Sequence, residues 1–227
     1  MKRYAYKLIT FTLLFFAVGA CTLEKEALSD DDPNSGSSKN SLTEIIATNI
    51  SYPDGGRGSI ATVKVLIMTD FNEKEIASTK YENDGFRLSL PKTVPDEYLQ
   101  NGTLPESFSG TISDKKLKTA IMGIVAYNTY GEQIGEFVCC SLKDLNDDSY
   151  SSYYAMGYLF ANGDCTAKGD WKWKGVGGDY VTEIDVSYKK GWNILYLKTS
   201  KRGYYKYTSL NTTNKPTEKF YWHYHEY

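Results

Sequence analysis

The sequence predicts an all-β protein with an antiparallel β-sandwich architecture, and three observations support this. Apolar and polar residues alternate over short stretches rich in β-branched side chains, which is typical of strands that bury one face. Glycine, asparagine and aspartate separate these stretches at short intervals, as they do at hairpin turns. No stretch shows a helical apolar period over more than two turns.

The first predicted strands alternate clearly. The sequence Asn-Asp-Gly at 83–85 predicts a tight turn, and residues 95–99 could form a single helical turn. The strands of this first part are expected at 46–52, 61–67, 75–81 and 86–90.

A second group of predicted strands begins near residue 117. Residues 120–127 (AIMGIVAY) are almost continuously apolar, which is typical of a central strand buried on both faces. Further strands are expected at 134–140, 150–160, 165–173, 180–188, 192–199, 204–209 and 220–224.

The domain organisation follows from the length of the strand-rich part. Residues 41–227 are enough for one large sandwich or two small ones. The stretch between 91 and 113 is poor in strand signals, so we expect a sandwich at 41–113 and an aromatic-rich one at 114–227. Strands from both halves could equally share one core.

Residues 58–91 carry a more specific pattern, which ends in Asp84-Gly85-Phe86 and then Leu88, Leu90 and Pro91. This stretch resembles the prealbumin-like module of carboxypeptidase-regulatory and surface-anchored repeat domains. The resemblance, which covers about 34 residues, supports a sandwich fold. Together with the expected boundary it leads us to expect two immunoglobulin-like or prealbumin-like sandwiches in tandem. In such modules the role is scaffolding or display, and no catalytic residue comes with it.

The N-terminus has the features of an export signal. Three basic residues precede an apolar stretch at 8–18, which is too short to span a hydrocarbon core of about 30 Å. The sequence Val18-Gly19-Ala20-Cys21 then resembles a bacterial lipobox. The resemblance implies that residues 1–20 are a lipoprotein signal peptide and that Cys21 is acylated. A secreted protein with an incidental cysteine is the alternative.

Residues 21–40 are polar and acidic, and we expect a flexible tether there. The run Ser-Asp-Asp-Asp at 29–32 resembles the acidic export signals of Bacteroidota-type lipoproteins, although in that pattern the run sits closer to the cysteine. The resemblance implies lipid anchoring at the outer membrane with surface exposure. A solvated charge run on a periplasm-facing protein is the alternative.

Charge and motifs exclude several classes of function. The chain has a net charge of -2, and removal of residues 1–20 leaves 23 basic and 28 acidic residues, so we expect no nucleic-acid partner. There is no P-loop, dinucleotide-binding glycine pattern, G-x-S-x-G or H-E-x-x-H sequence. We therefore expect no enzyme and no cofactor, although a pair of carboxylates for glycoside hydrolysis is defined only in space.

Three cysteines remain besides Cys21. Export permits disulfides, and adjacent Cys139 and Cys140 point to opposite faces of a strand, so either one, but not both, could bridge to Cys165. The alternative is three thiols that act as small buried hydrophobes. No base is indicated that would make one of them catalytic.

The two histidines, His223 and His225, lie on one face of a predicted strand, about 6–7 Å apart. A metal would need a third ligand, which the sequence does not indicate. We expect both side chains to face solvent. The acidic loop at 144–148 lacks the glycine and closing glutamate of an EF-hand, so we expect no metal there.

Aromatic residues make up 15% of the chain and are densest in its second half. Trp171 and Trp173 share one face of a predicted strand, and Tyr205 and Tyr207 share a face of a later one. Flat aromatic faces beside polar residues suit the stacking of sugar rings, which makes these four residues a candidate ligand face. Core packing is the alternative, and we assign Trp192 to the core.

We therefore expect a lipid-anchored cell-envelope protein with a non-enzymatic binding, adhesion or structural role. It resembles Bacteroidota-type lipoproteins of this build, some of which act in adhesion and others in polysaccharide capture. The alternative function is glycan binding in a polysaccharide-capture system. The expected partners are the membrane, through the N-terminal lipid, and a surface protein or polysaccharide.

Overall fold

A computed structural model describes residues 42–52, 60–69, 73–101, 108–145, 151–175, 178–202 and 206–227. Within these ranges the chain forms strands and one turn of 3-10 helix at Asp96–Tyr98, which confirms the all-β prediction. The predicted signal peptide, Cys21 and the tether lie outside the described residues. In the described part of the chain, no helix is long and apolar enough to cross a membrane.

The predicted strands occur in the expected order, and two further strands, Gln100–Asn101 and Phe108–Ile112, form in the stretch 91–113 that was expected to be poor in strands. The first part of the chain forms β1 (Glu44–Ala47), β2 (Ile60–Met68), β3 (Glu73–Lys80), β4 (Phe86–Ser89), β5 (Gln100–Asn101) and β6 (Phe108–Ile112). The second part forms β7 (Lys118–Asn128), β8 (Gln133–Cys140), β9 (Ser152–Ala161), β10 (Cys165–Gly175), β11 (Gly178–Tyr188), β12 (Gly191–Arg202), β13 (Lys206–Thr212) and β14 (Tyr221–Glu226).

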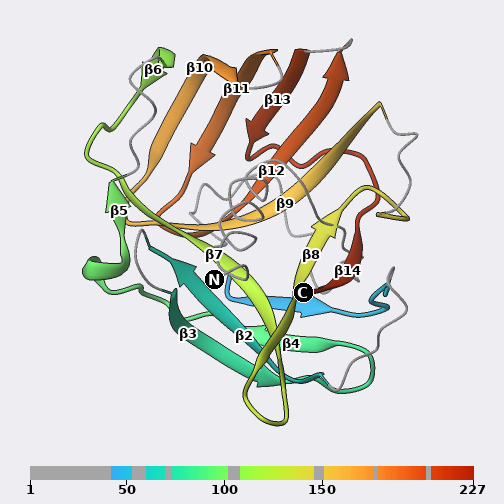
Figure 1. The fold of residues 1–227 in the computed structure, drawn as a ribbon. Coiled ribbons are helices and arrows are strands. Elements are labelled where there is room, and N and C mark those ends of the chain that lie inside the picture. The colour runs from blue at the N-terminus through green and yellow to red at the C-terminus, as the bar shows by residue number, and fades with distance from the viewer. Residues whose placement is uncertain are drawn as a thin grey trace, which may run out of the picture.

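Two sheets contain these strands. The small sheet pairs β1 with β4, and the large one has the order β3-β2-β7-β8-β9-β12-β13-β11-β10-β6, with β14 beside β8 and β5 beside β7. Among these pairings, β11 with β13 is parallel and the others are antiparallel. In Figure 1, β10, β11, β13 and β12 run side by side in the upper part, while β2, β3 and β4 lie in the lower part.

Strand β7 joins the two regions of the large sheet. Its residues 119–122 pair with β9, and its residues 124–127 pair with β8. Along its other edge β7 pairs with β2, so strands from both predicted halves belong to one sheet.

The largest core cluster lies between the small sheet and one face of the large sheet. It takes residues from β1, β2 and β4 as well as from β7, β8, β9, β12 and β14. The ring centroid of Phe86 on β4 lies 4.9 Å from that of Phe137 on β8 and 5.3 Å from that of Trp222 on β14. The boundary expected near residue 113 therefore does not separate two cores, because both halves contribute to this one.

The turn predicted at 83–85 is present, and its conformation explains its sequence. Asn83 and Asp84 have φ angles of 54° and 56°, in the left-handed region that these two residue types tolerate well. Backbone hydrogen bonds in both directions between Glu82 and Gly85 close the turn. Past the turn, β4 alternates as expected, with Phe86 and Leu88 buried and the residues between them exposed.

Candidate functional site

Strand pairing brings three of the four predicted ligand-face residues together. In β10, Trp171 is opposite Thr182 and Trp173 is opposite Tyr180 of β11. Tyr180 is also the register partner of Tyr207 on β13. Tyr205 lies outside the described residues, and the side chains of Trp173 and Tyr207 are not described.

These residues form two adjacent rows across the sheet, at the end of β10 that is far from Cys165. We name Trp173, Tyr180 and Tyr207 the aromatic row. The neighbouring hydroxyl row contains residues of β10, β11, β13, β12 and β9, which are Trp171, Thr182, Ser209, Thr199 and Tyr153. Register partners project from the same face of a sheet, and neighbouring strands lie about 4.8 Å apart.

A direct contact confirms the shared face. The Ser209 hydroxyl donates a hydrogen bond to Thr182 Oγ1 at 2.8 Å, between β13 and β11. Trp171 and Tyr180 are half-buried, and Thr182 is buried. Within the predicted ligand face, the indole of Trp171 is therefore partly accessible. Its neighbours on the adjoining strands are hydroxyl and aromatic residues.

The same face changes character along the strands. Toward the start of β10 it is apolar, with a cluster of Ala167, Ile184 and Val186. Toward the two rows it carries aromatic and hydroxyl groups, and neither row contains a carboxylate or an imidazole. Such a surface can stack against a ring and exchange hydrogen bonds with hydroxyl groups, but the rows hold no acid–base pair for hydrolysis.

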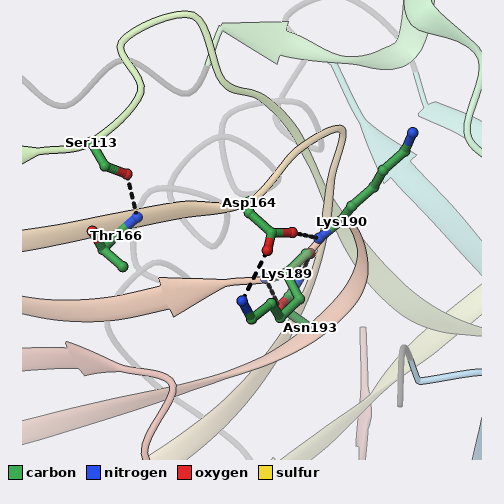
Figure 2. A network of polar contacts seen from close by, with 6 residues as sticks. All are labelled: Ser113, Asp164, Thr166, Lys189, Lys190 and Asn193. Carbon is green, nitrogen blue, oxygen red and sulfur yellow. Dashed lines mark hydrogen bonds and ion pairs between the residues drawn. The ribbon is translucent and has the colours of Figure 1, made fainter. Parts of the chain in front are cut away.

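A network of polar contacts fixes the other end of β10 (Figure 2). Asp164 accepts hydrogen bonds from the backbone N–H of Lys190 at 2.8 Å and from the Lys189 ammonium at 2.9 Å. These two donors hold the pKa of the exposed Asp164 carboxyl below its ordinary value. Ser113 accepts a hydrogen bond from the Thr166 N–H through its hydroxyl oxygen, so three turns meet where β10 begins. These contacts fix the start of β10, the strand that contains Trp171 and Trp173.

The structure contains no bridge from Cys139 or Cys140 to Cys165. All three thiols are buried, and they belong to three different clusters. Cys139 and Cys140 do face opposite sides of β8, as expected, but Cys165 lies at the start of β10, where its thiol is 3.7 Å from the Asp114 carbonyl oxygen. The alternative of small buried thiols describes what the structure contains.

The prediction that both histidines face solvent is wrong for His223. His225 is exposed, but His223 is fully buried. The reason is that β14 is covered on both faces at this point, by the main core on the Trp222 side and by the segment after β8 on the other. Burial lowers the pKa of His223, although its hydrogen bond with the Leu142 carbonyl and the charge of Asp144 oppose the shift.

Sequence reasoning missed a polar cluster on the outer face of β8 and β14. Glu136 is the register partner of His225, and burial raises its pKa. The Tyr227 hydroxyl lies 3.5 Å from the Glu136 carboxylate and accepts a hydrogen bond from Gln133. A lone glutamate in the otherwise apolar stretch I-G-E-F-V-C-C at 134–140 was the available signal.

Within the described ranges, no group of three His, Cys, Asp or Glu side chains could hold a metal ion. Most of the acidic loop at 144–148 lies outside these ranges. No family model, curated protein or solved structure matches this chain.

Proposed function

We propose that this chain is a lipid-anchored cell-envelope protein with a non-enzymatic binding, adhesion or structural role. The lipid anchor rests on the sequence around Cys21, and the binding role rests on the two rows at the end of β10, β11 and β13. The outer membrane is the proposed location, with the folded part exposed at the surface.

Among these roles, polysaccharide capture is the one that the geometry favours. The observation that supports it is the alignment of Trp173, Tyr180 and Tyr207 on three neighbouring strands, next to the hydroxyl row. The three positions repeat at the strand spacing of about 4.8 Å, so a chain of sugar rings laid across these strands would pass one aromatic position after another. The half-buried hydroxyls of Ser209 and Thr199 in the hydroxyl row would exchange hydrogen bonds with the sugar hydroxyls, whereas Thr182 and Tyr153 are buried.

A protein partner is the second candidate, and the edge strand β3 favours it. In the described sheet β3 pairs with β2 alone, and it stands at the end of the strand order. Exposed edges can accept a further strand, which is a common mode of adhesion. However, Glu73, Lys74 and Glu75 are exposed and charged on this strand, and such side chains discourage indiscriminate pairing.

The ligand class can be tested with the chain from residue 22 onward, run by affinity electrophoresis through gels that contain different polysaccharides. We expect one polymer to retard the protein, and Trp171→Ala and Trp173→Ala to abolish the retardation. Tyr130→Ala is the matched control, because Tyr130 is 87% exposed on the turn after β7. Unchanged retardation in both tryptophan variants would exclude the rows as the site, and no retardation by any polymer would favour the protein partner.

The anchor is tested separately in cells. Wild-type protein should take up labelled fatty acid and fractionate with membranes, and Cys21→Ser should do neither. Protease added to intact cells should degrade the anchored protein if it faces outward, whereas protection until the outer membrane is permeabilised would contradict surface exposure.

A further inference from the structure

His223 on β14 is a buried titratable group with half of its hydrogen-bonding capacity unused. The side chain is fully buried, and its Nε2 lies 3.0 Å from the carbonyl oxygen of Leu142. Its other ring nitrogen, Nδ1, is buried and has no hydrogen-bond partner among the described residues. The pocket around it is apolar, because the same side of the sheet holds the cluster of Cys140, Tyr153 and Ala155.

The contact with Leu142 fixes the tautomer. A carbonyl oxygen only accepts, so Nε2 carries the proton and Nδ1 of the neutral ring presents a lone pair. Protonation of the ring would place a second N–H donor, and a positive charge, in surroundings with no acceptor at Nδ1. A buried unpaired donor is costly, and a buried unpaired charge costs more.

The charged and titratable groups around His223 come from four elements. They are Glu136 and Cys140 on β8, Tyr153 on β9, Tyr221 and His225 on β14, and Lys143 and Asp144 in the segment after β8. Residues 146–150 lie outside the described part of this connection. Of the carboxylates named, Asp144 is the one whose charge acts on His223, and it is exposed on the very segment that covers the imidazole.

We propose that His223 is a proton-operated latch on residues 142–145. The neutral ring holds the segment closed through the Leu142 carbonyl. When the ring takes up a proton, the closed arrangement leaves the charge uncompensated, and the segment opens so that water and the Asp144 carboxylate reach Nδ1. The latch involves neither the aromatic row nor the lipid anchor, and it shares only the buried Tyr153 with the hydroxyl row, so it goes beyond the proposed function.

The segment that opens, residues 142–145, begins directly after a fixed residue, Ser141. Ser141 is held to β9 by two hydrogen bonds with Tyr154, in which the Ser141 N–H donates to the carbonyl and the Ser141 hydroxyl accepts from the N–H, both at 2.9 Å. The next contact along the chain is Leu142 with His223. Opening therefore pivots at Ser141 and uncovers the Cys140 thiol, whose sulfur lies 3.9 Å from the Leu142 carbonyl oxygen.

The first test uses the fact that the chain has only two histidines. Histidine-labelled protein from residue 22 onward should give two sets of imidazole NMR signals, and the set that remains in His225→Gln, a change at the exposed histidine, belongs to the buried ring. At pH 7.5 its nitrogen shifts should show a proton on Nε2 and none on Nδ1. Protonation of this ring on acidification should coincide with loss of hydrogen-exchange protection at the amides of residues 142–145. A ring that becomes protonated while those amides stay protected would overturn the latch.

The second test measures access to Cys140 in a Cys139→Ala, Cys165→Ala background, with a disulfide reagent that reacts in acid. The labelling rate is divided by that of the unfolded chain at the same pH, which removes the pH dependence of the thiol itself. We expect the protection of Cys140 to fall by up to about tenfold for each pH unit below the ordinary histidine pKa of 6.5, because the closed state takes up its proton only at lower pH.

His223→Gln is the matched control, because glutamine keeps an N–H donor for Leu142 but takes up no proton in this range. Its Cys140 protection should be the same at pH 7.5 and 5.5. If the glutamine variant loses protection as the wild type does, another group operates the opening and the proposal is wrong. If the variant does not fold, the NMR and exchange measurements on the wild-type protein still decide the matter.

Discussion

The indole nitrogen of Trp222 donates a hydrogen bond to the carbonyl oxygen of Ile46 at 3.2 Å, and this contact joins β14 to β1 across 176 positions of the chain. The indole is 1% exposed and meets the ring of Phe86 edge-on. The small sheet is thus fastened to the strand that comes last in the sequence.

Trp222→Ala should therefore be strongly destabilising. Removal of a buried indole typically costs about 3–5 kcal/mol, and here it also leaves the Ile46 carbonyl without its donor. Trp222→Phe keeps most of the volume and should cost less. Urea unfolding measures both, with Trp171→Phe as the control, since Trp171 is half-buried and outside the main core. Equal stability of Trp222→Ala and wild type would contradict the role of this contact.

Two glycines make a matched pair for testing how closely β14 lies against β8. A Cβ added at Gly135 would overlap with the His225 carbonyl oxygen and the Tyr224 ring, whereas at Gly157 its nearest neighbour would be a Leu197 methyl at 3.6 Å. Gly135→Ala should lower the free energy of unfolding by about 2 kcal/mol or more, because the overlap involves backbone. Gly157→Ala should be near neutral. The same loss in both variants would show that the close approach is not the cause.

Stability should depend on pH through His223. Burial holds its folded-state pKa below the ordinary 6.5, so below pH 6.5 the unfolded chain binds a proton that the folded chain does not. The free energy of unfolding should therefore fall as the pH is lowered from 7.5 to 5.5, by at most about 1.4 kcal/mol per pH unit. His223→Gln should remove this slope.

Glu136 acts in the opposite direction at lower pH. Burial raises its pKa above 4.5, so its protonation favours the folded state, and this contribution appears only as the pH falls toward that range. Glu136→Gln should thus alter the stability profile near pH 5 and leave the His223 slope above pH 6 in place. If Glu136→Gln also removed the slope above pH 6, that slope would not be due to His223.

The burial of the three cysteines predicts how their thiols react in the folded and in the denatured protein. In protein that starts at residue 22, the three thiols should react with an aromatic disulfide reagent only after denaturation, because all three are buried. Reduced and non-reduced samples should have the same electrophoretic mobility. Fewer than three thiols in the denatured protein would indicate a covalent bridge.

The alternation of side chains was enough to predict the class of fold and most strands. At 86–90, for example, every second residue is apolar and buried, and the turn before it has the residues that its positive φ angles favour. Pairing was harder. The double partnership of β7 with β8 and β9 depends on how a long strand bends through the molecule, and its apolar sequence allows any buried neighbour.

The candidate site was predictable only within a strand. A spacing of two residues placed Trp171 and Trp173 on one face, but nothing local could reveal that β13 lies parallel to β11 and brings Tyr207 into register with Tyr180. His223 shows the same limit. The neighbouring sequence shows only which face of a strand the side chain occupies. The segment that buries it lies about 80 positions earlier in the chain.

The fastening of β1 by Trp222 also bears on how the protein is made. Contacts between residues far apart in sequence slow folding, because the intervening chain must be ordered before they form. The main core needs Phe220, Trp222 and Tyr224, so a chain that has not yet delivered these residues has an open core along β2, β4 and β8. In the export that we propose, the polypeptide would therefore stay incompletely folded until its last strand is present, and its apolar surface would need protection until then.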